Sequence, residues 1–149
     1  MSKVLGNYLP SEVVDMLNQG RTTAVLSSLT EQGNPHAMPV HLMAAPNERT
    51  IFAALLRNHQ TVKNIIVNGR AFLTLMEGSD MAYGIQCGAS LIRDPMKASK
   101  AMCMLKLEVK EVKSDTTPTV IVVEGIKIKH RSLKTTEFLE AIFDELRNS

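Results

Sequence analysis

The chain has 149 residues, of which 44% are hydrophobic and 21% are charged, and its formal net charge is +2. That length allows one domain with a substantial core, and the hydrophobic fraction is ordinary for a folded globular protein. The small net charge and an aromatic content of 4% without Trp argue against a nucleic-acid-binding surface. We therefore expect a single domain spanning residues 1–149 and no nucleic-acid partner.

The two cysteines, Cys87 and Cys103, lie in no CxxC pattern and have no neighbouring residues at ligand spacing. A disulfide framework or a zinc site is therefore not expected. The N-terminal sequence MSKVLGNYLPSE lacks the long apolar region of a signal peptide, and no apolar run is long enough to span a membrane. These features favour a cytoplasmic protein without a membrane partner.

The first predicted element is a helix at 9–20, which has Pro in its first turn and Gly at its end. Strands follow at 22–29 and 36–44, and the turn-forming sequence TEQGNP between them predicts a hairpin. Pro39 falls within the second strand, where it has no backbone N–H to donate to a neighbour. We therefore expect Pro39 at a sheet edge or at a bulge.

A third strand is predicted at 50–56, followed by a short helix at 61–69 that Thr61 or a neighbour caps and Gly69 ends. The remaining predicted elements are strands at 70–78 and 81–94, a helix at 95–103, strands at 105–112 and 119–130, and a helix at 135–148. The connections between strands are mostly short turns, which indicates a mainly antiparallel sheet. Six or seven short strands of this kind favour a barrel.

Several catalytic and nucleotide-binding motifs are absent from the chain. The sequence contains no GxxxxGK[ST], no GxGxxG between a strand and a helix, no GxSxG and no HExxH. His36 and His41 are five residues apart on one predicted strand, so their side chains point to opposite faces and we expect no metal site. The basic segment KIKHRSLK (127–134) alternates in a way that favours a solvated strand face over an anion site.

The sequence RNHQTVKNI (57–65) joins a predicted strand to a predicted helix and is rich in hydrogen-bond donors. Ordinary turns contain Gly, Pro, Asp or Ser, and this one contains none of them. The N–H groups at a helix N-terminus are unpaired and favour negative charge. Arg57, Thr61 and Lys63 would add charge and directional donors, which together would make a phosphate site. A solvent-exposed loop with paired cations explains the segment equally well.

The order of GRTTAVLSSLTEQGNPHAMPV, RNHQTVKNI and GASLIRD resembles the FMN-binding split-barrel superfamily, which includes proteins related to pyridoxamine 5′-phosphate oxidase. The resemblance runs from about Leu9 to Val112. It implies a mainly β (α+β) fold, a six-stranded antiparallel Greek-key split β-barrel with flanking helices. It also implies a homodimer with FMN at the subunit interface.

The resemblance assigns roles to two segments of the chain. By position, Arg57, Thr61 and Lys63 would contact the FMN phosphate. The residues that would line the same turn are Asn58, His59 and Gln60. Those that would lie beside the isoalloxazine ring and the ribityl chain are Pro39, Val40 and His41. Of these, His41 is the candidate for a hydrogen-bond or proton donor near the ring, although a plain pocket wall is the competing role.

The chain departs from the true pyridoxamine phosphate oxidases at its C-terminus. The resemblance leads us to expect a substrate-binding segment with a Trp and an Arg/His pair there, but the chain has no Trp and ends in KTTEFLEAIFDELRNS. We therefore expect an FMN-dependent oxidoreductase of the related type, served by a small-molecule or protein electron donor. The alternative is a non-catalytic carrier or sensor that holds flavin, deazaflavin or haem, because other branches of the superfamily bind haem or a deazaflavin.

Overall fold

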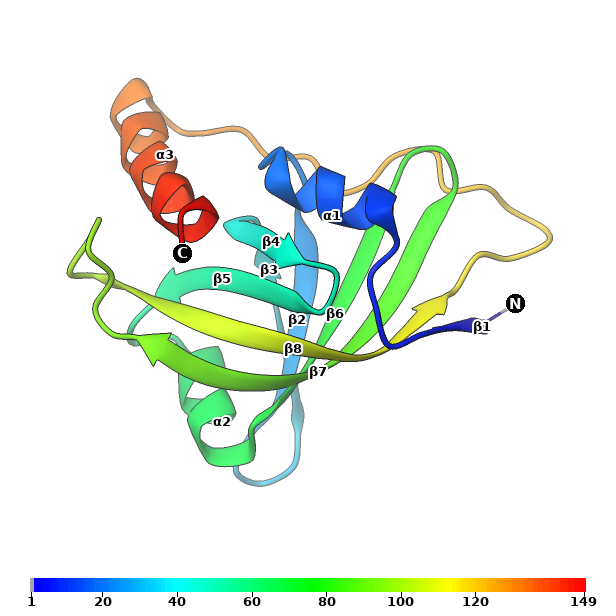
Figure 1. Ribbon diagram of the computed structural model, residues 1–149, viewed down its shortest axis with the longest axis horizontal. Coiled ribbons are helices and arrows are strands. Elements are labelled where there is room, and N and C mark those ends of the chain that lie inside the picture. Colours follow the sequence, from blue (N-terminus) through cyan, green and yellow to red (C-terminus); the bar gives the residue numbers. More distant parts are fainter. Residues whose placement is uncertain (1) are drawn as a thin grey trace.

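The computed structural model describes residues 2–149, which form one antiparallel sheet and three helices (Figure 1). The helices are α1 (Ser11–Asn18), α2 (Gln60–Asn68) and α3 (Leu133–Arg147). The strands are β1 (Lys3–Gly6), β2 (Ala24–Leu29), β3 (Pro35–Val40), β4 (Met43–Asn47), β5 (Thr50–Leu56), β6 (Arg70–Glu77), β7 (Met81–Arg93) and β8 (Met102–Ser114). The predicted strands at 22–29, 50–56, 70–78, 81–94 and 105–112 are thus all present.

The strands follow the order β3-β2-β6-β7-β8-β5-β4, and β1 pairs with the far end of β8. All neighbouring strands in this order run antiparallel. β3 and β4 end the order and do not pair with each other, so the curved sheet stays open between them. This is the predicted split barrel, built from eight strands among residues 2–149 instead of six because the short β1 and β4 add to it.

The inner face of the sheet forms the main core. Strand β2 alternates buried and partly buried residues, as expected for a strand with one face in the core. The fully buried side chains that the strands contribute include Leu26, Leu73, Leu75, Ile85, Leu105 and Leu107. Helix α1 adds Val13 and Leu17 to this cluster, and α2 adds Val62 and Ile65. The apolar stripes of α1 and α2 therefore position both helices against the barrel.

Helix α3 packs on a second cluster beside β4 and β5, through Ile142 and Leu146. Its Glu145 accepts hydrogen bonds from Arg93 Nη1 at 2.8 Å and from the backbone N–H of Lys97 at 3.0 Å, and it also accepts from Ala98. Burial pushes the pKa of Glu145 upward, but these donors outweigh it and leave the pKa below its ordinary value. Glu145 thus fixes the link between β7 and β8 to the C-terminal helix.

The prediction of one strand at 36–44 was wrong, because the chain makes two strands there. β3 pairs with β2, and β4 pairs with β5 at the other end of the strand order. The break at His41 and Leu42 carries the chain from one edge of the sheet to the other. Pro39 lies on β3, which pairs only with β2, so the prediction that it lies at a sheet edge is confirmed.

The predicted helix at 95–103 is absent. A helix would commit its backbone N–H groups to carbonyls four residues earlier. Here the N–H groups of Lys97 and Ala98 donate to Glu145, and Met96 N donates to Met102 O at 2.8 Å. The segment is therefore an irregular link held by α3.

The predicted strand at 119–130 is also wrong. The strand before it, β8, already pairs with β7 on one side and with β5 and β1 on the other, so no edge of β8 is left for it. The segment instead crosses the turn between β6 and β7, where Asp80 N donates to Val122 O at 3.1 Å and Val122 N donates to Asp80 Oδ1 at 3.0 Å. The two backbones touch there, since a Cβ on Gly125 would lie 2.1 Å from Met76 O.

We expect Tyr83→Phe to test the contact that ties β7 to α1. The Tyr83 hydroxyl donates to Glu12, and burial together with Glu12 raises the pKa of Tyr83 to about 12 from 10.0. Since the folded pKa exceeds the unfolded one, the contribution is full below pH 10 and is lost as the pH rises from 10 to 12. The variant should lose about 1 kcal/mol of unfolding free energy at pH 8, measured by urea unfolding. A deficit that stays constant up to pH 12 would contradict this assignment.

Candidate functional site

The N-terminus of α2 is capped by a histidine. β5 ends at Leu56, and α2 begins at Gln60 after a short turn. The Nδ1 atom of His59 accepts a hydrogen bond from Thr61 N at 3.1 Å, which makes His59 the N-cap. At the other end, Gly69 has φ +69°, the left-handed conformation that favours glycine, as predicted for the helix stop. The predicted cap, Thr61 or a neighbour, is therefore His59.

The Arg57 side chain is held by the link between β7 and β8. Its Nε donates to Asp94, its Nη1 reaches Lys100 O at 3.4 Å, and its backbone N donates to Ala101 O at 3.0 Å. A cavity of about 350 Å³ lies here, lined by Leu56, Arg57, Asn58, His59, Lys100 and Ala101. It brings three of the predicted site residues together with one cation that sequence reasoning missed, Lys100. The wrong helix prediction at 95–103 concealed that residue.

Two buried side-chain atoms in residues 2–149 have no hydrogen-bond partner, His36 Nε2 and Thr61 Oγ1. Thr61 is fully buried in the first turn of α2, and His36 lies on β3. The ring centroids of His36 and His59 are 5.7 Å apart, with the rings tilted by 56°. Both orphaned atoms therefore belong to one neighbourhood around the capping histidine. A buried polar atom without a partner costs about 1–3 kcal/mol, so their coincidence needs an explanation.

The protonation state of His59 follows from its cap. Nδ1 accepts a hydrogen bond, so the proton of the neutral ring is on Nε2. Burial, and then the nearby His36, lowers the pKa of His59. Both effects favour the neutral ring, which leaves Nε2–H as a donor.

The other residues of the predicted phosphate site have different surroundings. Lys63 is exposed, one turn along α2 from His59, and no ion pair in residues 2–149 engages its ammonium group. Gln60 Nε2 donates to Asn64 Oδ1 at 2.7 Å, and Asn64 Nδ2 donates to Ser28 Oγ at 3.0 Å. This chain of hydrogen bonds links the first turn of α2 to strand β2.

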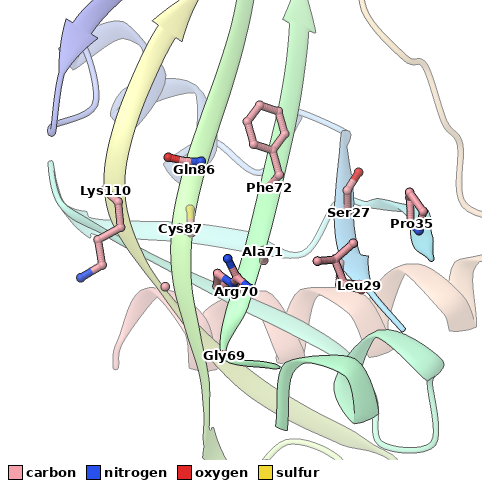
Figure 2. Close-up of a pocket in the computed structure, with 12 residues that line it drawn as sticks. Ser27, Leu29, Pro35, Gly69, Arg70, Ala71, Phe72, Gln86, Cys87 and Lys110 are labelled. Atoms are coloured by element: carbon pink, nitrogen blue, oxygen red, sulfur yellow. The ribbon is translucent and has the colours of Figure 1, made fainter. Parts of the chain in front are cut away.

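Ser28 also lines a groove of about 530 Å³ on the sheet, the larger of the two cavities beside α2 (Figure 2). Ser27, Phe72 and Gln86 stand opposite one another on β2, β6 and β7 and form its middle. Arg70 and Lys110 add two cations. Figure 2 shows the groove spreading across these strands, with Gly69 at the end of α2. An apolar floor with a few polar groups is typical of small-molecule sites.

The residues predicted beside the flavin ring are not all on one surface. Pro39 is exposed on β3, whereas Val40 is only 2% exposed and its side chain belongs to the core. His41 is half-buried between β3 and β4. Burial, and then the charge of His130, lowers the pKa of His41. Val40 therefore offers only its backbone to a ligand.

The structure pairs the histidines differently from a metal site. His36 contacts His59, while His41 interacts with His130. In residues 2–149 no three His, Cys, Asp or Glu side chains are grouped to hold a metal ion.

No helix in the same part of the chain is long and apolar enough to cross a membrane. Burial raises the pKa of Cys87 to about 12, so its thiol stays protonated.

Three solved structures share this fold at low sequence identity. A candidate pyridoxamine 5′-phosphate oxidase from Lactobacillus delbrueckii is 19% identical, with 75% of this chain and 98% of that one covered and a TM-score of 0.62. A FAD-binding protein from Mesorhizobium loti is 10% identical, with 75% and 99% covered and a TM-score of 0.54. HutZ, the haem storage protein from Vibrio cholerae, is 14% identical, with 82% and 99% covered and a TM-score of 0.53.

No curated protein sequence matches the chain. The sequence pattern of the pyridoxamine 5′-phosphate oxidase family, however, matches residues 9–130, which include every strand except β1 and both helices that close the main core. The match includes β3, the α2 N-terminus and the groove. The chain therefore belongs to the pyridoxamine 5′-phosphate oxidase family.

Proposed function

We propose that the protein is a cytoplasmic FMN-dependent oxidoreductase that binds the FMN phosphate at the N-terminus of α2. The observation that carries this proposal is the unpartnered hydroxyl of Thr61, buried in the first turn of α2. A second unpartnered atom, Nε2 of His36, belongs to a ring on β3 that lies 5.7 Å from the ring of the capping His59. A phosphate oxygen would give each of them a partner. The free N–H groups of the helix and the Lys63 ammonium would add donors and positive charge.

The rest of the cofactor would lie along the outer face of the sheet, beside β3 and in the groove. Phe72 and Ser27 give this face a flat, mainly apolar surface suited to a ring system. Gly84 leaves room for the Phe72 ring on this surface, because a Cβ at position 84 would lie 2.7 Å from that ring. Arg70 and Gln86 would donate to polar atoms of the cofactor or of a substrate. FMN, when bound, would supply the electron or hydride transfer, and the protein would orient it.

The substrate of the reaction differs from that of pyridoxamine phosphate oxidase in this proposal. The chain has no Trp, and its C-terminus forms α3, which packs on β4 and β5 away from the groove. Residues 133–147 pack there and do not line the groove of their own protomer. We therefore propose that the protein uses the cofactor chemistry of its family with an electron donor or acceptor other than pyridoxamine phosphate.

The second candidate function is binding without turnover. His41 beside His130 offers imidazole nitrogens of the kind that ligate haem iron, and one structural relative is a haem storage protein. The absorption spectrum of the purified protein distinguishes flavin, deazaflavin and haem. Anaerobic reduction of bound flavin by NADH or NADPH would favour the enzyme, whereas no reduction by either would favour the carrier.

Thr61→Val should separate the ligand's contribution from that of the fold. The Thr61 hydroxyl has no partner in the protein, so an isosteric methyl group should raise the unfolding free energy of the ligand-free protein by about 1–3 kcal/mol. The same variant should bind FMN about tenfold more weakly, because a phosphate hydrogen bond is lost. Urea unfolding and fluorescence titration measure the two effects. A stabilised variant with unchanged FMN affinity would contradict the site.

Lys63→Ala and Arg57→Ala should each weaken FMN binding by about 1.5–3 kcal/mol, the scale of a charged hydrogen bond. The matched control is Lys134→Ala, an exposed lysine near the start of α3, which should leave the affinity unchanged. Riboflavin, which lacks the phosphate, should bind the parent and all three variants alike. Equal losses for FMN and riboflavin would mean that the phosphate lies elsewhere.

We also propose a homodimer with the cofactor at the interface. The groove opens across β2, β6 and β7, where Ser27, Phe72 and Gln86 stand opposite one another (Figure 2). A second copy of the chain over this face would enclose the ring. Sedimentation at micromolar concentration should therefore give the mass of a dimer, and a monomer would overturn this part of the proposal.

A further inference from the structure

Residues 119–134 lead from β8 past the turn between β6 and β7 to the first turn of α3, on the outside of the molecule (Figure 1). They include KIKHRSLK (127–134), whose cations would lie on the solvated face of the strand that the sequence predicts. Because residues 119–130 form no strand, that explanation no longer accounts for them. The exposed side chains of this segment therefore need another one.

The segment exposes a large share of the apolar side chains at the surface. Six of the 14 large hydrophobic residues that are exposed in residues 2–149 lie within these 16 positions. Ile121 is 71% exposed, Val123 is 80% exposed and Leu133 is 75% exposed. The other three are Val120, Ile126 and Ile128. Single exposed apolar residues are ordinary, whereas a group of them along one segment marks an interaction site.

The same residues carry the positive charge of the chain. They hold four of its 17 Lys and Arg residues and one of its 15 Asp and Glu residues, which gives a formal charge of +3. The rest of the chain holds 13 cations and 14 anions, a formal charge of −1. Glu124 pairs with Lys127, and no ion pair in residues 2–149 engages Lys129, Arg131 or Lys134. The segment is therefore complementary to a negatively charged partner.

Contacts near both ends hold the segment against the rest of the protein. Val122 N donates to Asp80 Oδ1 at 3.0 Å, and Asp80 N donates to Val122 O at 3.1 Å. Further along, Nδ1 of His130 lies 2.7 Å from Oγ1 of Thr136 on α3. A segment fixed in this way has less conformational freedom to lose when it binds a partner.

We propose that residues 119–134 bind an anionic membrane surface. Such a surface accepts both kinds of side chain, because aliphatic groups enter the boundary below the headgroups while Lys and Arg lie among the anionic headgroups. The segment from 119 to 130 is neither helix nor strand. Its backbone N–H and C=O groups therefore stay at the level of the headgroups, where water satisfies them. This contact lies on the membrane and requires no spanning helix.

Two other partners match only part of the pattern. A nucleic acid would attract the cations, but the segment has no Phe, Tyr or Trp to stack on bases, and a phosphate backbone leaves the six aliphatic side chains without a role. A second copy that docked segment to segment would use the same patch on both chains and would bring two charges of +3 together. The groove over which we place the second copy has no lining residue from this segment.

The experiment is co-sedimentation of the full chain with vesicles of phosphatidylcholine alone and with vesicles that also contain phosphatidylglycerol. One Lys or Arg near an anionic surface strengthens binding about fivefold, so a charge of +3 should favour the phosphatidylglycerol vesicles about a hundredfold. Binding should weaken as salt is added. Lys129→Gln together with Arg131→Gln should weaken it by about 25-fold, since two cations are lost.

A second pair of substitutions tests the aliphatic side chains. Ile121→Ser together with Val123→Ser leaves the charge unchanged and should weaken binding to the phosphatidylglycerol vesicles by about tenfold or more. The matched control is Arg21→Gln together with Arg49→Gln, because both arginines are exposed and lie outside the segment. It removes the same net charge as the first pair and should bind within about twofold of the parent protein.

The outcomes separate the three partners. No binding, equal binding to both kinds of vesicle, or equal weakening in the control pair overturns the proposal. A change from dimer to monomer in Ile121→Ser with Val123→Ser, measured by sedimentation without vesicles, would make the segment a contact between copies. Binding to duplex DNA that is tighter than binding to the vesicles and unchanged in the same variant would make it a nucleic-acid site. Urea unfolding checks that each variant folds, and FMN titration is a separate measurement, so neither proposal depends on the other.

Discussion

The hydrogen bond from Thr61 N to Nδ1 of His59 is the contact on which the candidate site depends. It fixes where α2 begins and therefore where the free N–H groups of the helix face. It also fixes the tautomer of His59, because an acceptor nitrogen has no proton. An Asn or Ser cap would define the helix start equally well but would bring no second ring nitrogen. The imidazole cap gives the helix end an additional donor at Nε2.

A chain of polar contacts connects this helix end to the C-terminus of the protein. Arg57 is bound to the link between β7 and β8 through Asp94, and the same link donates two backbone N–H groups to Glu145 of α3. Lys100 follows both anchors in the same link, its carbonyl accepts from Arg57 Nη1 at 3.4 Å, and it lines the cavity beside His59. The position of Lys100 therefore depends on α3, although α3 packs on β4 and β5. A C-terminal helix that looks peripheral thus shapes the cation set at the site.

Local sequence signals predicted the parts of the site that are local in the chain. The helix stop at Gly69 and the donor-rich turn before α2 were both visible, because they involve residues within one or two turns of each other. The contact between His36 and His59 joins β3 to α2, and no periodicity reports such a pairing. Val40 illustrates the same limit, because only the register of β3 against β2 decides that it faces the core.

Two of the three errors in secondary structure, those at 95–103 and at 119–130, have a common physical cause. At 95–103 the backbone donors of Lys97 and Ala98 bond to Glu145, nearly 50 residues later in the chain. At 119–130 the alternating apolar residues would suit a strand, but β8 has no free edge and the segment crosses the turn at Asp80. In both cases a distant part of the chain determined where the backbone hydrogen bonds go. Propensity describes only what a segment would do with its neighbours in sequence.

The unpartnered atoms Thr61 Oγ1 on α2 and His36 Nε2 on β3 reduce the stability of the folded protein. A fully buried hydroxyl with no acceptor lowers the unfolding free energy, and a valine in its place would fit the same volume. A ligand that satisfies Thr61 and His36 returns that free energy on binding, and it stabilises the folded chain in proportion to its concentration. The same two atoms therefore link binding to folding. Among residues 2–149, these two are the buried side-chain polar atoms without a hydrogen-bond partner, so a ligand that reached them would supply what the fold does not.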